Sequence, residues 1–137
     1  MIKRLFSVIF KKEFPKNNPI NENGKISSYY IHLIRDIEDS KYCSISDNEE
    51  IFIKNLLIKL NQSNEHGALK LRRMSDKAID FSYNGFPIGR IKMHGNNTWM
   101  QILLSLYDFK QIENVSLEEY IENIDLWIKY IKKVKNI

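Results

Sequence analysis

The sequence has few of the residues on which common catalytic and structural sites depend. Among 137 residues it has one cysteine, three histidines, three prolines and five glycines. The single cysteine, Cys43, excludes an intramolecular disulfide. The histidines (His32, His66 and His94) are isolated from one another and from other ligand residues, a spacing that does not favour zinc. We therefore expect neither a metal site nor a cofactor.

Long apolar runs are also lacking. No segment approaches the roughly 20 consecutive apolar residues that a membrane-spanning helix requires. The first twelve residues, MIKRLFSVIFKK, begin like a secretory signal, but two lysines interrupt the apolar run early and no small-residue cleavage site follows. Together with the single cysteine, which suits a reducing compartment, these features favour a cytoplasmic protein.

Charge is distributed unevenly along the chain. The formal net charge is +4, and residues 69–94 alone carry six Lys/Arg against two Asp, also +4. Residues 1–16 are likewise basic, whereas residues 36–50 are strongly acidic. The abundance of Ile, Lys and Asn is a bias that AT-rich coding DNA produces by itself, so the total charge says less than its separation. Faces of opposite sign can steer charged partners or dock another protein.

The N-terminal segment, residues 1–14, predicts a basic amphipathic helix. Apolar residues recur at helical spacing, and two lysines close the segment: Ile2, Leu5, Phe6, Ile9, Phe10, Lys11 and Lys12. Such a helix can lie on an anionic membrane surface or dock on a partner, which would make the protein peripheral to a membrane. Alternatively, the stripe packs on the core. Residues 15–25 are polar with two prolines, and we interpret them as a linker before a domain at 26–137.

Three helices are predicted within that domain, at about 27–38, 47–60 and 116–134. The second begins at a capping box, Ser46 with Glu49, and the third at another, Ser116 with Glu119. In this interpretation Glu49 caps a helix and has no catalytic role.

Residues 68–104 predict an antiparallel β-meander of three to four strands. Apolar and polar residues alternate in short runs, and Asn84-Gly85 is typical of a two-residue hairpin turn. After this turn the alternation slips, so that Arg90 and Lys92 would face the core. A β-bulge at Gly89–Arg90 would correct the slip, because glycine within a strand often marks a bulge. The predicted fold class is therefore α+β, with the meander packed against the helices.

With that bulge, one sheet face is basic and contains an aromatic ring. If the second turn is at Gly95-Asn96, Lys92 lies opposite Trp99. The candidate binding residues are Lys70, Arg72, Arg90, Lys92, Trp99 and Gln101. Cations neutralise phosphates and an indole ring stacks on bases, so this face predicts nucleic-acid binding. Two alternatives stay open, a solvated sheet face and a face covered by a helix.

Catalytic motifs give no comparable indication. An acidic helix followed by strands with Asp80 and Arg90-Ile91-Lys92 resembles the order of parts in restriction-type nucleases. That chemistry needs at least two acids to hold Mg²⁺, whereas Arg90 stands where a ligand is required. A degenerate relative without catalysis remains an alternative. We expect a non-enzymatic module that binds nucleic acid, with a protein partner or a membrane surface as alternatives.

Overall fold

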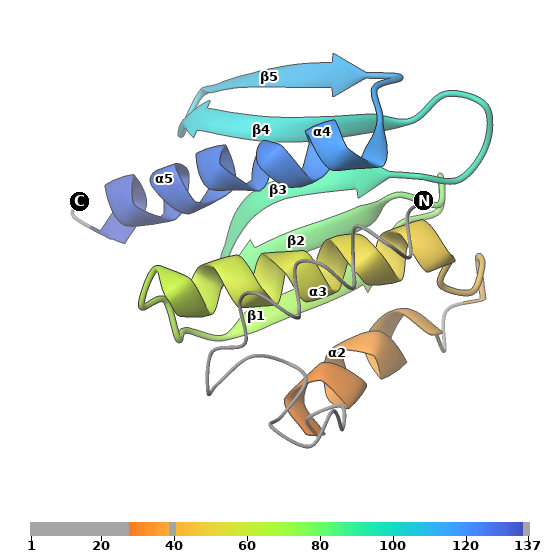
Figure 1. The fold of residues 1–137 in the computed structure, drawn as a ribbon, viewed down its shortest axis with the longest axis horizontal. Helices are drawn as coiled ribbons and strands as arrows, with labels where there is room; N and C mark the ends of the chain where they lie inside the picture. The colour runs from red at the N-terminus through yellow and green to blue at the C-terminus, as the bar shows by residue number, and fades with distance from the viewer. Residues whose placement is uncertain (1–27, 39–40, 136–137) are drawn as a thin grey trace.

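The computed structural model describes residues 28–38 and 41–135, which form a single α+β domain (Figure 1). The elements follow in the order α2 (Ser28–Glu38), α3 (Asp47–Gln62), β1 (Leu69–Arg73), β2 (Ile79–Tyr83), β3 (Phe86–Lys92), β4 (Trp99–Ser105), β5 (Asp108–Glu113), α4 (Leu117–Glu122) and α5 (Ile124–Lys135). The N-terminal segment 1–14 and the linker 15–25 lie outside the described residues, so the predictions made for them stay predictions.

The strands form one antiparallel sheet in which each pairs with its neighbours in the sequence, β1-β2-β3-β4-β5. This arrangement confirms the meander. The predicted turn at Asn84-Gly85 is also confirmed: both residues have positive φ, +51° and +88°, and Tyr83 pairs with Phe86 across it. The strand number was underestimated, because the meander continues beyond residue 104 into β5. None of the β5 residues is fully buried, so the strand has no need of an apolar face. Its sequence therefore lacks the apolar alternation that marks the other strands.

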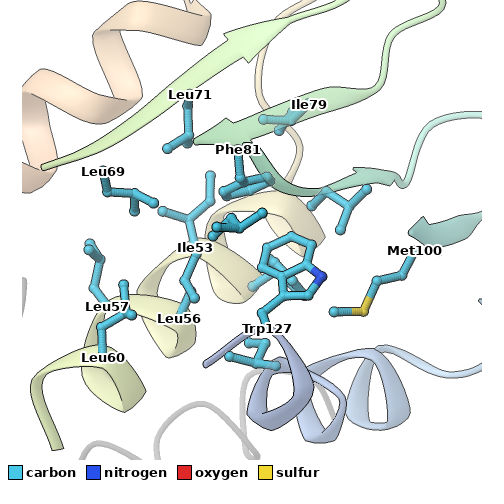
Figure 2. Packing of buried hydrophobic residues seen from close by; sticks show 14 of the residues in the cluster. Ile53, Leu56, Leu57, Leu60, Leu69, Leu71, Ile79, Phe81, Met100 and Trp127 are labelled. Carbon is cyan, nitrogen blue, oxygen red and sulfur yellow. The ribbon is translucent and has the colours of Figure 1, made fainter. Parts of the chain in front are cut away.

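The hydrophobic core lies between one face of the sheet and the helices α3, α4 and α5. Figure 1 shows α3 and α5 crossing this face, while α2 lies beside β1. Apolar side chains of α3 meet those of β1 and β2 in Figure 2. At the centre three rings pack with their centroids 4.9–5.9 Å apart, those of Phe52, Phe81 and Trp127. The aromatic cluster joins α3, β2 and α5 into one core.

Helix boundaries agree with the predictions, with one correction at the C-terminal end. The capping box of α3 is present: Ser46 Oγ accepts from the Glu49 backbone N–H at 3.2 Å, and Glu49 Oε1 accepts from Ser46 N–H at 2.9 Å. The single helix predicted at 116–134 is instead divided into α4 and α5 at Asn123. The side-chain amide of Asn123 donates to the Glu119 carbonyl at 2.9 Å, and such side-chain bonds compete with regular helical ones.

None of the helices in the described ranges is both long and apolar enough to cross a membrane.

Candidate nucleic-acid interface

A β-bulge decides which side chains of β3 reach the outer face, the sheet face opposite α3 and α5. Ser82 pairs with Pro87 and Phe81 pairs with Gly89, which leaves Ile88 as the extra residue. The bulge is therefore at Ile88–Gly89, one residue earlier than predicted. Its consequence is the predicted one, since Ile88 and Ile91 are fully buried while Arg90 pairs with Asp80. Met93, just beyond the end of β3, packs against the core and is only partly buried.

Gly89 allows this bulge to pack closely against α5. A Cβ atom at this position would lie 2.5 Å from Trp127 Nε1 and 2.5 Å from the Gln101 carbonyl oxygen. In the space that the glycine leaves, Trp127 Nε1 donates a hydrogen bond to that same Gln101 oxygen at 2.9 Å. The core indole thus contacts the backbone of two neighbouring strands, β3 and β4, which carry the centre of the outer face.

The six candidate residues come together on the outer face as the register predicts. Lys92 pairs with Trp99 and Arg90 with Gln101, both as expected. On the next strands Arg72 pairs with Asp80 and Lys70 with Ser82. Because paired residues of an antiparallel sheet project to the same side, these residues share one surface.

None of the described helices covers this face (Figure 1). Of the two alternatives left open by the sequence, a helix over this face is not found in the part of the chain that the structure describes. Lys70 and Arg72 are exposed, and Trp99 and Gln101 are partly exposed. Within residues 28–38 and 41–135, these side chains are therefore accessible to a ligand, and a solvated surface is the other alternative.

The charge of this face is lower than the candidate residues alone suggest. Arg90 Nε donates to Asp80 Oδ1 at 2.9 Å in a cross-strand ion pair. The unpredicted strand β5 places Glu113 opposite Trp99 and Gln111 opposite Gln101. The four basic residues thus meet two acidic ones, Asp80 and Glu113, for a net charge of +2. The side-chain amide of Gln111 on β5 adds hydrogen-bonding groups near the Trp99 indole.

A buried ion pair lies on the helix side of the sheet, and sequence reasoning missed it. Arg73 donates from Nη1 to Glu49 Oε2 at 2.6 Å and from Nη2 to Oε1 at 3.0 Å, and both side chains are almost inaccessible to solvent. His94 Nε2 lies 3.2 Å from Glu49 Oε1. The interpretation of His94 as isolated is therefore wrong, because folding brings the β3–β4 loop to the start of α3.

This cluster has a structural explanation. The Arg73 guanidinium also donates to the carbonyls of Lys77 at 2.8 Å and Ser44 at 3.1 Å. Arg73 consequently ties two loops and the start of α3 to the end of β1. Its neighbour Arg72 faces solvent, and only the alternation of the strand distinguishes the two arginines.

The electrostatics of Glu49 predict how stability depends on pH. Burial alone would raise the pKa of Glu49, but hydrogen bonds from Arg73 and the Ser46 backbone, with the charges of Arg73 and His94, lower it below its ordinary 4.5. Below that pH the unfolded carboxyl binds more protons than the folded one. The stabilisation is therefore complete above about pH 4.5 and is lost as the pH falls through the lower folded-state pKa.

We expect Glu49→Gln to remove this acid sensitivity. A single carboxyl contributes up to about 1.4 kcal/mol per pH unit to the slope of the unfolding free energy against pH. Urea unfolding between pH 3 and 6 would measure the slope for the wild type and the variant. Exposed Glu113→Gln is the matched control. Equal slopes for Glu49→Gln and the wild type would contradict the prediction.

Neither a metal-ligand cluster nor a known relative points to another site. In residues 28–38 and 41–135 no group of three or more His, Cys, Asp or Glu could hold a metal ion. In the acidic stretch 36–50, Glu49 is buried in the ion pair with Arg73, which reduces the surface charge available to a protein partner.

No family model, curated protein or solved structure matches the chain.

Proposed function

We propose that the protein is a non-enzymatic module that binds single-stranded nucleic acid on the outer face of its sheet. The observation that carries this proposal is the adjacent placement of Lys92 with Trp99 and Arg90 with Gln101 on a face that none of the described helices covers. Those pairs bring cations, an indole ring and an amide together on two neighbouring strands.

The chemistry of these residues suits a flexible strand with its bases exposed. Lysine and arginine neutralise phosphates, and an aromatic ring supplies a stacking surface that accepts any base. Gln101 and Gln111, which pair across β4 and β5, offer donors and acceptors to base edges. An open sheet face presents these groups to unstacked bases, whereas a duplex hides the faces of its bases.

Two acidic residues limit the affinity that this face can provide. Asp80 already neutralises Arg90, and Glu113 lies opposite Trp99, where it repels phosphate. We therefore expect weak binding that depends strongly on salt and little on base sequence. The carboxylate of Glu113 is also a point at which charge reversal should strengthen binding.

Binding of a fluorescent oligothymidine or oligouridine, followed by anisotropy as salt rises, tests the proposal. We expect Trp99→Ala to weaken binding by about 1–3 kcal/mol through lost stacking. Lys70→Ala with Lys92→Ala, two lysines of this face that Asp80 does not neutralise, should reduce the salt slope by about 1.4, since each phosphate contact contributes about 0.7 for a single strand.

Matched control variants distinguish binding at this face from nonspecific attraction by the positive charge of the protein. Lys129→Ala with Lys133→Ala removes two charges from α5, on the other side of the sheet, and should leave the slope unchanged. Undetectable binding at low salt would contradict the proposal. So would an equal loss of affinity from the α5 pair and the outer-face pair, because the charge would then act without a site.

A further inference from the structure

Exposed apolar side chains gather at the turn between β4 and β5. Among the described residues six large hydrophobic side chains are exposed, and four of them lie within residues 104–109: Leu104, Leu106, Tyr107 and Phe109. Leu106 is 64% exposed and Tyr107 is 96% exposed. In the described domain these side chains are exposed to water, and burial of their apolar surface in an interface would be favourable. We call residues 104–109 the hairpin tip.

The hairpin tip lies beside the basic end of α5. Lys133 Nζ donates to the Leu104 carbonyl at 3.2 Å, which joins the helix to the last residues of β4. Lys129 and Lys133 border a hollow of about 250 Å³ whose walls include Leu104, Leu126 and Tyr130. Figure 1 shows the β4–β5 turn and the C-terminal end of α5 at the same end of the molecule. Leu104 of the hairpin tip therefore lines one hollow with the two lysines, at the same end of the domain as the rest of the tip.

The cations of this surface have no strong acidic partner in the described domain. Lys135 is held by Glu65, with both carboxylate oxygens 3.1 Å from its Nζ, so we exclude it. Lys110 on β5 and Lys129 and Lys133 on α5 are exposed, and Asp108 is the acidic residue within the hairpin tip. Three lysines against one aspartate give this surface a positive charge, which favours an anionic occupant.

From this combination we propose that the hairpin tip docks the protein on an anionic lipid surface. Leu106 and Tyr107 form a convex turn, whose side chains fit between lipid headgroups with the tyrosine hydroxyl in the interface. The lysines then contact acidic headgroups, each contributing attraction near the surface. A specific protein interface requires roughly 800 Å² on each partner, more than one short turn supplies, and this favours the membrane.

This docking uses a different surface from the proposed nucleic-acid interface, and either can fail alone. The proposal does not rest on the basic segment 1–14, which lies outside the described residues. The full chain serves for every measurement, so that each variant differs from the wild type only at the substituted residues.

Sedimentation with vesicles of phosphatidylcholine and phosphatidylserine at a 3:1 ratio tests the docking. The vesicles bind the wild-type protein, whereas Leu106→Ser with Tyr107→Ser lowers the partition coefficient at least about tenfold, since the inserted apolar groups are lost. Lys129→Gln with Lys133→Gln lowers it about fivefold for each charge and reduces its dependence on salt. Vesicles of phosphatidylcholine alone bind the protein weakly.

The matched control is Ile31→Ser with Tyr42→Ser, which removes an aliphatic and an aromatic residue that are 45% and 42% exposed elsewhere on the domain. This variant binds vesicles like the wild type. Circular dichroism and thermal unfolding verify that each variant folds. The proposal is overturned if the wild type does not sediment with acidic vesicles, or if the hairpin and control variants bind equally. Capture of a protein through the tip without vesicle binding overturns it as well.

Discussion

Replacing Arg73 by methionine is expected to lower the free energy of unfolding by about 3–5 kcal/mol, because it leaves the Glu49 carboxylate buried without its cation. Glu49 is fully inaccessible and receives two hydrogen bonds from the guanidinium. Methionine retains much of the apolar stem, so the cost arises chiefly from the uncompensated charge. The carbonyls of Lys77 and Ser44 also lose their donors. A domain of ordinary stability would retain little net stability after such a change.

The adjacent residue provides the control for this prediction. Arg72 lies on the same strand but is exposed, and Arg72→Met should change the free energy of unfolding by less than about 0.5 kcal/mol. Urea unfolding of both variants at pH 7, monitored by tryptophan fluorescence, measures the difference. Similar costs at the two positions would show that the buried ion pair contributes nothing specific.

A double-variant cycle separates the ion pair from the packing. Glu49→Gln should itself be destabilising, because its amide would face the Arg73 donors. In the Arg73→Met background, however, the same change removes an unpaired charge, so the double variant should be more stable than the sum of the single losses predicts. Strictly additive losses would indicate that Arg73 and Glu49 stabilise the fold independently.

The second large effect is expected at Gly89, where alanine should cost about 2–4 kcal/mol through overpacking and backbone strain. The added Cβ would lie 2.5 Å from both Trp127 Nε1 and the Gln101 carbonyl oxygen, far inside contact distance. Its φ of +156° lies at the edge of the region that favours glycine. Relief would require the strand to move away from α5 or the indole to leave the centre of the core. Thermal unfolding should show a drop of several degrees for each kcal/mol.

Two further variants identify the cause of that loss. Gly95 has a φ of +89°, but no atom lies within 4 Å of the place that an added methyl group would take, so Gly95→Ala should cost only about 1 kcal/mol from its backbone conformation. Trp127→Phe removes the colliding Nε1 atom, and it should cost less in the Gly89→Ala background than in the wild type. Equal costs for the two glycine substitutions would contradict a role for the Trp127 contact.

Much of the meander could be predicted from local sequence because its signals act over a few residues. Asn84 and Gly85 tolerate positive φ, which determines the turn and hence the partners of Tyr83 and Ser82, up to the bulge. The need to keep Arg90 and Lys92 out of the core then required a bulge, and the structure moves it by one residue to Ile88. Ser46 and Glu49 likewise marked the start of α3, because a capping box is completed within one turn.

The candidate face was predicted only in part. Its six residues depend on the registers of β1 through β4, which alternation and turns specify. Glu113 and Gln111 were missed, because β5 is an edge strand with little buried surface and so lacks an apolar alternation. Glu113 opposite Trp99 reduces the positive charge of the face, and Gln111 opposite Gln101 adds a side-chain amide. Both residues change the expected affinity for nucleic acid.

The sequence by itself determined the α+β class, the antiparallel order and the alternation that separates a core face from a polar face. These properties follow from periodicity, turn residues and helix caps, which depend on neighbours along the chain. Only the tertiary structure decided that Arg73 is buried with Glu49 while Arg72 is exposed, and that Trp127 packs on Gly89. It also decided that the exposed hairpin tip meets the lysines of α5. Each of these depends on contacts between distant segments, whose geometry exists only once the sheet and helices have packed.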